Sequence, residues 1–263
     1  MNLRTLFMPE DSPGARGVTA AQVLNYALAL LLLAAFLTFA FHQLAYHWNW
    51  QALYKYRAKF VQGWMVTVLI SLAALACSTL LGVILALARR SRVLLLSSLA
   101  QICVEIIRGT PLLVQLLLFF YVIAEAVGVT NRYLVGVLTL SLFSGAYISE
   151  IIRAGIESVG RSQLDAARAV GFTSRQTYRY VIFPQALRQA LPPLAGEFAS
   201  LVKNSSLLSI IGIGEFTLNA QEVNSYTYST LESYLPLALG YLVLTLPISL
   251  WTRWLENRNR YET

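Results

Sequence analysis

The chain has 263 residues, a mass of 29.2 kDa and a formal net charge of +7. Hydrophobic residues make up 57% of it and charged residues 13%, against roughly 45–50% and about 25% in an average soluble protein. This composition excludes a disordered chain and a disulfide scaffold, and it argues against a soluble enzyme, because too few polar residues are available to cover a surface. We therefore predict an all-α, polytopic membrane helix bundle of about six transmembrane helices.

Six apolar runs of 17 to 32 residues follow one another along the chain, and a membrane-spanning helix needs roughly 20. Residues 1–17 are polar, so we expect the first run to stay as an anchor and not to be cleaved as a signal peptide. The third run is interrupted at Gly109, Thr110 and Pro111, where we predict a kink. The predicted spans are 23–41, 61–88, 93–124, 133–149, 189–213 and 233–252.

The distribution of Lys and Arg predicts the orientation of these spans. If the polar insert at 150–188 is cytoplasmic, fourteen basic residues fall in cytoplasmic segments and four in outer ones. This asymmetry follows the positive-inside rule and predicts that both termini are cytoplasmic. The basic cluster at 55–59 goes against the rule, because it then lies outside.

Residues that could carry catalysis or hold a metal are sparse. The sequence has no phosphate-binding G-x-x-x-x-G-K-[ST] loop, no G-x-G-x-x-G and no HExxH. His42 and His47 flank the first span, where they are typical of an interface, and Cys77 and Cys103 form no CxxC pair. We predict no catalytic residue, no metal and no cofactor on this chain, and no nucleic acid partner, because the basic residues lie between apolar runs.

The polar insert carries the most informative local pattern. Ser162 and Asp165 fit a helix-start box, Gly171 suits the left-handed position after a helix, and Thr173 with Gln176 predicts a second helix start. The second helix is expected to end near Pro184. The insert therefore reads as helix, glycine break and helix, and from these residues alone it fits an amphipathic membrane-surface helix equally well.

Residues 162–184, SQLDAARAVGFTSRQTYRYVIFP, resemble the cytoplasmic "EAA" loop of bacterial ABC-importer permeases. That loop has Glu-Ala-Ala, three residues, Gly, nine residues and Ile-x-Leu-Pro; this chain keeps the spacing, with Asp for Glu, Val for Ile and Phe for Leu. The resemblance extends over 104–122, 144–159 and 184–215, which look like the polar amino-acid branch of that superfamily.

The resemblance implies a transport subunit of a multi-chain importer in the bacterial cytoplasmic (inner) membrane. A second permease subunit, identical or similar, completes the pathway, a periplasmic or lipid-anchored solute-binding protein delivers the amino acid, and membrane lipid surrounds the spans. A cytoplasmic ATPase dimer binds ATP and Mg and supplies the energy. The residues implied to couple to the ATPase are Asp165, Ala166, Ala167, Gly171 and Phe172.

The resemblance also implies a domain organisation, because permeases of this family commonly have five core spans. Residues 1–60 are then an N-terminal cytoplasmic segment, an extra span and a periplasmic linker. Residues 61–255 are the permease core, with the coupling loop at about 153–188. Residues 256–263 are a basic cytoplasmic tail.

Charged residues within the apolar runs are candidates for a substrate pathway, because such residues cost roughly 2.5–3.5 kcal/mol on insertion scales. Glu105 and Arg108 are three positions apart, so they are expected to pair with each other or to line the pathway; Glu150 and Arg153 repeat the spacing. Glu197 and Lys203 are six apart and poorly placed to pair on one straight helix. The pathway candidates are Glu105, Arg108, Glu197, Lys203, Asn204, Ser205 and Ser206.

Two other functions stay open at this point. An ion-coupled secondary transporter would need its own ion site and often has an internal repeat, which we do not find. A membrane-embedded enzyme would need a convergent acid, base or metal set. The sequence leaves open which amino acid is carried and whether the second permease is the same chain.

Overall fold

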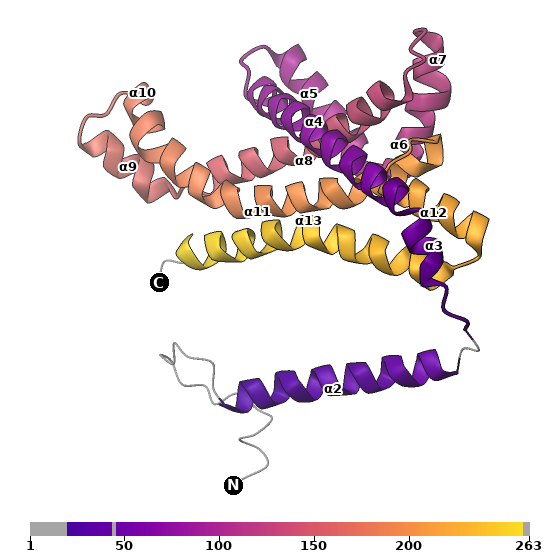
Figure 1. The fold of residues 1–263 in the computed structure, drawn as a ribbon. Helices are drawn as coiled ribbons and strands as arrows, with labels where there is room; N and C mark the ends of the chain where they lie inside the picture. Colours follow the sequence, from indigo (N-terminus) through magenta and orange to yellow (C-terminus); the bar gives the residue numbers. More distant parts are fainter. Residues whose placement is uncertain (1–19, 44–45, 260–263) are drawn as a thin grey trace. The chain divides into compact units, whose positions relative to one another are not determined.

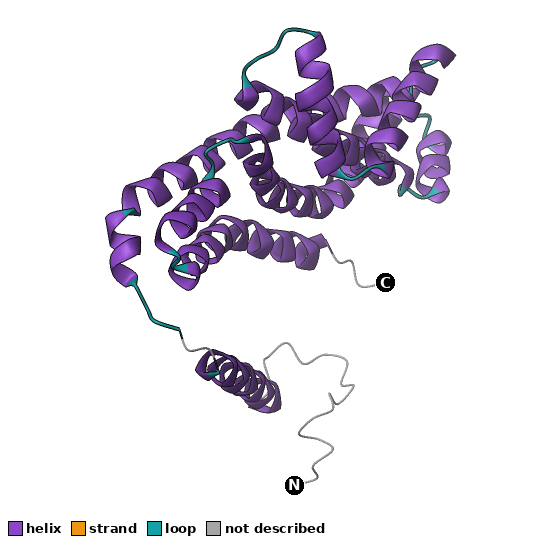
Figure 2. Cartoon of the chain, turned by 90° about the vertical axis from the view of Figure 1, so that its right-hand side faces the viewer, coloured by secondary structure: helices purple, strands orange, loops and turns teal. Residues whose placement is uncertain are grey.

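The computed structural model describes residues 20–43 and 46–259, and every regular element among them is a helix (Figures 1 and 2). The chain divides into two units, residues 1–48 and residues 49–263. The predicted all-α fold is thus confirmed for the described residues. The ends of the chain lie outside these residues, so their cytoplasmic location stays a prediction.

The first unit contains one described helix, α2 (Ala20–His42), which is apolar along its length. Its residues Gln22–His42 have the length and hydropathy of a membrane span. At 1.5 Å per residue such a helix is about 30 Å long, the thickness of the hydrocarbon core. This agrees with the predicted run at 23–41. Beyond the helix, the rings of Tyr46 and Trp48 pack edge to face with centroids 5.4 Å apart.

The second unit begins with a long helix and a sharply bent pair. Its first elements are α3 (Trp50–Lys55), α4 (Arg57–Arg89), α5 (Leu94–Gly109), α6 (Leu112–Leu118), the π-helix η1 (Phe119–Ile123), α7 (Ala124–Ala126) and α8 (Arg132–Glu157). The helical segments before and after Pro111 meet at 110°. Pro111 has extended backbone and precedes α6, which confirms the predicted kink.

The remaining helices follow α8 in the chain. They are α9 (Arg161–Ala169), α10 (Ser174–Thr177), the π-helix η2 (Tyr178–Ile182), α11 (Phe183–Asn204), the 3₁₀-helix η3 (Ser205–Ile211), α12 (Phe216–Thr227) and α13 (Thr230–Asn259). Helix α11 packs against α8, α12 against α4, and α13 against α11. The helix that starts at Ser174 does not end near Pro184 as predicted, because α10, η2 and α11 follow without a gap. Pro184 lies in the first turn of α11, where a missing N–H is tolerated.

Four described helices are long and apolar enough to cross a membrane, and a fifth crossing is formed if the bent pair counts as one. The predicted run at 189–213 lies mostly in α11, which has 22 residues but is not among them. This helix carries Pro192, Pro193, Glu197 and Lys203, which lower its hydropathy. A sixth span therefore stays a prediction.

Glycines let the helices that lead to the polar insert pack at close range. A Cβ added at Gly82 of α4 would lie 2.5 Å from Cγ2 of Ile148 on α8. A Cβ added at Gly155 of α8 would lie 2.8 Å from the Ala186 carbonyl oxygen on α11. Since α8 enters the insert and α11 leaves it, these contacts fix both ends of the insert on the bundle.

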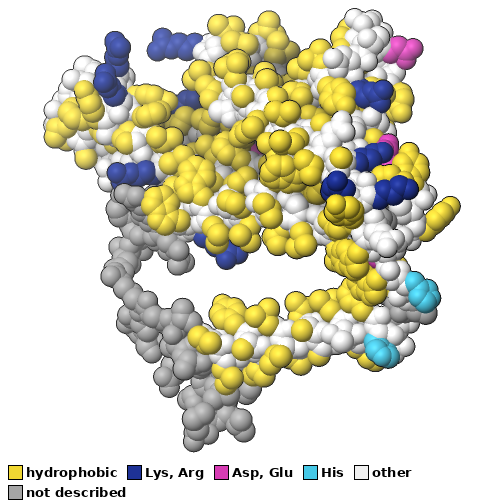
Figure 3. All heavy atoms as spheres, viewed as in Figure 1, with side chains coloured by type: hydrophobic (Ala, Val, Ile, Leu, Met, Phe, Trp, Pro, Cys, Tyr) yellow, Lys and Arg dark blue, Asp and Glu magenta, His cyan; other side chains and the backbone are white. Residues whose placement is uncertain are grey.

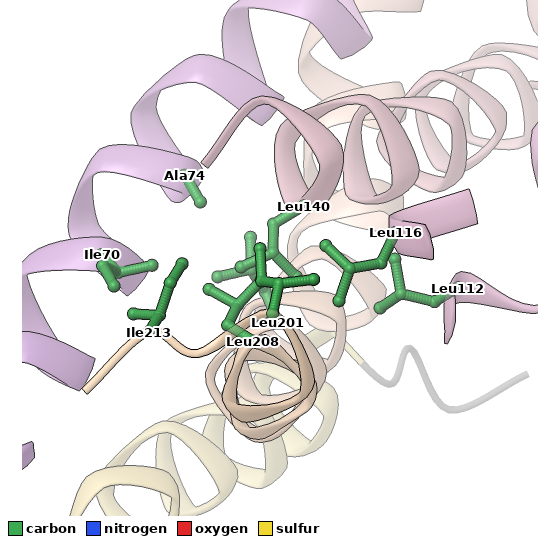
Figure 4. Packing of buried hydrophobic residues seen from close by; sticks show 9 residues of the cluster. Ile70, Ala74, Leu112, Leu116, Leu140, Leu201, Leu208 and Ile213 are labelled. Carbon is green, nitrogen blue, oxygen red and sulfur yellow. The ribbon is translucent and has the colours of Figure 1, made fainter. Parts of the chain in front are cut away.

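A hydrophobic cluster holds the middle of the second unit together (Figure 4). Leu140 of α8, Leu201 of α11 and Leu208 of η3 are almost fully buried in it. The buried members are Ile70, Ala74, Leu112, Leu116, Leu140, Leu201, Leu208, Ile211 and Ile213. The cluster thus packs α4, α6, α8, α11 and η3 around one core.

The outer surface of the second unit is largely apolar. On the face that Figure 3 shows, hydrophobic side chains cover most of residues 49–259, with Lys and Arg towards the two ends. Leu69, Leu80 and Leu239 are each at least 60% exposed. Exposed apolar surface on this scale is typical of a helix bundle whose solvent is lipid.

Candidate functional site

The polar insert contains a helix, a left-handed glycine and a second helix. Gly171 has φ of +78° and its N–H donates to the Arg168 carbonyl at 3.0 Å, while the Phe172 N–H donates to the Ala167 carbonyl at 3.0 Å. These two bonds form a Schellman motif, which ends α9 and satisfies its last carbonyls. The predicted glycine break is therefore confirmed.

The second helix of the insert begins with a reciprocal cap. The Thr173 N–H donates to Gln176 Oε1 at 2.8 Å, and the Gln176 N–H donates to Thr173 Oγ1 at 3.3 Å. The rings of Phe172 and Tyr180 lie 6.3 Å apart and hold the turn against η2. The predicted capping box at Thr173 and Gln176 is confirmed.

The first predicted cap is wrong. Helix α9 begins at Arg161 with Gly160 before it, and no side chain caps its N-terminus. Ser162 thus lies inside the helix, and Asp165 pairs with Arg168 at 3.1 Å, one turn along. The spacing of Ser162 and Asp165 fits a helix start as well as two positions within a helix. Because Gly160 has extended backbone and is the N-cap residue, Ser162 lies two positions too late to cap the helix.

Four of the five predicted coupling residues are exposed on one short segment. The side chains of Asp165 and Arg168 are 68% and 76% exposed, Ala166 and Gly171 are exposed, and Phe172 is 38% exposed. Ala167 is the exception at 4%, because it lies on the inner side of α9. Val170, which the sequence did not single out, is 69% exposed beside Gly171. The segment therefore presents small and apolar groups flanked by charges, a surface that another protein can approach closely.

The carboxylate of Glu150, the first residue of the insert, connects three helices. It accepts from Arg89 of α4 at 2.6 Å, lies 3.6 Å from Arg108 of α5, and pairs with Arg153 one turn along α8. The expected pair of Glu150 and Arg153 is confirmed. The expected pair of Glu105 with Arg108 is wrong: the Arg108 guanidinium turns to Glu150 and to the ring of Tyr147, 5.4 Å from its centroid.

Glu105, by contrast, is exposed on α5, and the described part of the chain gives it no ion pair. The structure does not bring Glu105 and Arg108 together with the candidates on α11. Of these two predicted pathway residues, Arg108 thus lies at the charged junction of α4, α5 and α8, and Glu105 lies on the exposed side of α5.

The candidates on α11 differ in their surroundings. Glu197 is half-buried beside Ser144 of α8, and its Oε1 has no hydrogen-bond partner within the described residues. Lys203, two turns along, is exposed and has no ion pair in the described part of the chain. No direct pair of Glu197 with Lys203 forms, as their spacing predicts. Glu197 and Lys203 thus have no ion pair within the described part of the chain, which makes both candidates for contacts outside this chain.

Two of the three polar residues after Lys203 bond to backbone carbonyls of the preceding turn. Ser205 is fully buried and its hydroxyl donates to the Val202 carbonyl at 2.7 Å. The Ser206 hydroxyl donates to the Lys203 carbonyl at 2.7 Å, and Asn204 is partly buried. These bonds support the change from α11 to the tighter η3, so Ser205 and Ser206 have a structural role at this turn.

Residues 78–261 match the protein family described as the binding-protein-dependent transport system inner membrane component. The chain belongs to this permease family. The permease is therefore a transport component with several membrane-spanning helices. No group of three or more His, Cys, Asp or Glu side chains that could hold a metal occurs among the residues the structure describes.

Relatives with known names agree with this assignment. The permease is 38% identical over 199 residues to a Bacillus subtilis (strain 168) protein named as a probable glutamine ABC transporter permease, GlnM, with 76% of this chain and 92% of that protein covered. It is 39% identical over 193 residues to the nopaline transport system permease protein NocM of Agrobacterium fabrum (strain C58 / ATCC 33970), with 70% and 80% covered.

A solved structure carries the same fold. In the crystal structure of an amino acid ABC transporter with histidines, one chain is 36% identical to the permease, with a TM-score of 0.75 over 81% of this chain and 100% of that chain. The relatives and neighbours are thus permeases of amino-acid ABC transporters and not ion-coupled secondary transporters. The secondary transporter that the sequence left open is excluded by this result.

Proposed function

We propose that this chain is the permease subunit of a binding-protein-dependent importer of polar amino acids in the bacterial cytoplasmic membrane. ATP and Mg bind to a separate cytoplasmic ATPase dimer, and this chain has no ATP site or cofactor of its own. A second permease subunit, identical or similar, completes the pathway, and a periplasmic or lipid-anchored solute-binding protein delivers the substrate. Family membership supports this assembly.

The exposed insert is the observation that carries the proposal. Asp165, Ala166, Gly171 and Phe172 form an exposed surface at the end of α8, and the methyl side chain of Ala166 leaves room for a partner groove. The Gly171 break sets the angle between α9 and the helix that continues into α11. Movement of an ATPase docked on α9 is then transmitted to α8 and α11 as a rigid-body shift.

Polar amino acids are proposed as the substrate class because relatives are named as glutamine and nopaline permeases. A similar crystal structure is that of an amino acid ABC transporter with histidines. Glu197 and Lys203 supply one negative and one positive group on α11, complementary to the ammonium and carboxylate of a zwitterion. Asn204 and the hydroxyls of Ser205 and Ser206 are proposed to shape the turn beside them. Glu105 and Arg108 are proposed to lie at the rim of the pathway and not at its centre.

The test is a mild-detergent pulldown of the tagged full-length chain from native membranes, followed by mass spectrometry and an ATPase assay. We expect a cytoplasmic ATPase to be recovered with the wild type and lost with Ala166→Trp, which places bulk on the exposed face of α9. Ala126→Trp, at an exposed position of α7, is the matched control and should retain the ATPase. An ATPase-free preparation that still moves amino acids would overturn the proposal.

A further inference from the structure

Helices α4, α8 and α11, with Tyr178 of η2, surround a hollow of about 480 Å³ that none of the predicted coupling residues lines. Side chains reach it once per turn: from α8 they are Ile148, Ile152 and Ile156. The facing stripes of α4 and α11 are also mainly apolar. The volume falls within the roughly 300–1,000 Å³ of cavities that hold small molecules.

The hollow exists because its floor is made of small side chains. Ala86 of α4 and Ala186 and Ala190 of α11 line it and are 4%, 6% and 5% exposed. Gly155 of α8 packs against the two alanines of α11, since an added Cβ there would lie 2.8 Å from the Ala186 carbonyl oxygen and 3.3 Å from Ala190 Cβ. Helices α8 and α11 are therefore close at this point, and the small side chains leave the hollow unfilled.

The rim of the hollow is bulky, apolar and exposed. Its members are 40–63% exposed, which places them on the surface where a membrane chain meets lipid. They lie on both sides of the opening, on α4 and α11. They are Val83, Leu87, Phe183 and Leu187.

A single cation stands at one end of this apolar lining. Arg90 follows the last turn of α4, lines the hollow, and is exposed without an ion pair in the described part of the chain. Its neighbour Arg89 is already held by Glu150. Tyr178 of η2 also lines the hollow and adds a phenol. The lining contains no Asp or Glu, so it offers no negative charge to the ammonium group of an amino acid.

From this arrangement we propose that the hollow binds an anionic phospholipid, with an acyl chain over Ala86 and Ala190 and the phosphate at Arg90. The predicted orientation places Arg90 at the cytoplasmic end of α4, at headgroup level. Basic pockets between membrane helices on this side are suited to anionic headgroups. The hollow is lined by the two ends of the insert but by none of its exposed residues Asp165, Ala166, Gly171 and Phe172, and by neither Glu197 nor Lys203, so lipid binding there goes beyond the proposed function.

The test measures lipid binding to the purified full-length chain together with the subunits that accompany it. After delipidation in detergent, phosphatidylglycerol and phosphatidylcholine with identical acyl chains are titrated separately, and bound lipid is counted by native mass spectrometry. We expect tighter binding of phosphatidylglycerol. Arg90→Gln should weaken it about fivefold, the factor that corresponds to roughly 1 kcal/mol per basic residue near an anionic headgroup.

A second pair of variants tests the hollow itself. Val83→Trp covers the opening from an exposed position and should reduce binding of both lipids, whereas Leu80→Trp, exposed on the same helix outside the lining, should not. Arg92→Gln is the charge control. Equal binding of the two lipids by the wild type, or unchanged binding after Arg90→Gln or Val83→Trp, would overturn the proposal. Loss of another subunit from Val83→Trp with lipid binding intact would assign the hollow to a subunit contact and also refute it.

Discussion

Arg89, at the end of α4, donates a hydrogen bond to Glu150 of α8 across 2.6 Å. The Arg89 side chain is only 12% exposed and the Glu150 side chain 20% exposed. Arg108 and Arg153 reach the same carboxylate, so one acid connects α4, α5 and α8. Since α8 leads directly into the insert, this junction connects the insert to two further helices, and the proposed movement of the insert would reach them through it.

We predict that Glu150→Ala lowers the free energy of unfolding by about 1–3 kcal/mol, because a mostly buried guanidinium loses its acceptor. Uptake should fall as well, since α8 loses its charged link to α4 and α5 although their packing remains. Unfolding of the purified chain in detergent and uptake in proteoliposomes measure the two effects.

Glu157→Ala is the matched control for that change. Glu157 pairs with Arg153 alone and its side chain is 56% exposed, so its loss should change the free energy of unfolding by at most about 1 kcal/mol. Equal effects of the two variants would show that the junction at Glu150 is not specific.

Replacement of Gly171 should uncouple transport without affecting membrane insertion. Alanine has to adopt the left-handed conformation at φ +78°, which costs about 1–2 kcal/mol, although no atom lies within 4 Å of its Cβ. Proline cannot adopt this φ and also removes the bond to the Arg168 carbonyl. We expect reduced uptake and ATPase recovery for Gly171→Ala, and loss of both for Gly171→Pro.

Gly128 offers a control with the same backbone demand. It has φ of +72°, its N–H also bonds a carbonyl, that of Glu125, and no atom lies within 4 Å of an added Cβ. It follows α7, away from the insert. Gly128→Ala and Gly128→Pro should keep the ATPase bound; normal uptake by Gly171→Pro would refute the role of the break.

The features that the sequence predicted correctly depend on neighbours within a few positions. The cap at Thr173, the left-handed Gly171 and the bend at Pro111 each follow from the chemistry of one or two residues. Hydropathy likewise predicted the long apolar helices, because a span is defined by its own composition.

The features that the sequence missed depend on which helices meet. Arg108 has an acid three positions away in Glu105, yet it turns to Glu150 on another helix because α5 packs against α8. Ala167 is buried and Val170 is exposed, although both are apolar residues at the end of α9. No local sequence pattern predicts such contacts. The hollow beside Arg90 is likewise lined by helices that are far apart in the sequence.

Gly82→Ala should destabilise the crossing of α4 and α8. The added methyl group would lie 2.5 Å from Ile148 Cγ2, and relieving that overlap in a packed core costs about 1–3 kcal/mol. Gly109→Ala is the control, because an added Cβ there has no neighbour within 4 Å. Thermal unfolding of both purified variants in detergent measures the difference. Equal unfolding midpoints would mean that α4 and α8 shift to accommodate the added methyl group with no loss of stability.

The final prediction concerns Lys203, the exposed cation of α11 that has no ion pair in the described part of the chain. If it meets the carboxylate of the substrate, Lys203→Gln loses a charged hydrogen bond of about 1.5–3 kcal/mol, which raises the KM for uptake by about tenfold or more. Subunit assembly and basal ATPase activity should stay unchanged. Lys55→Gln removes an equal charge from α3 and should leave KM unaltered. A normal KM for Lys203→Gln would refute a contact with the substrate, and lost assembly would instead place Lys203 in a contact between subunits.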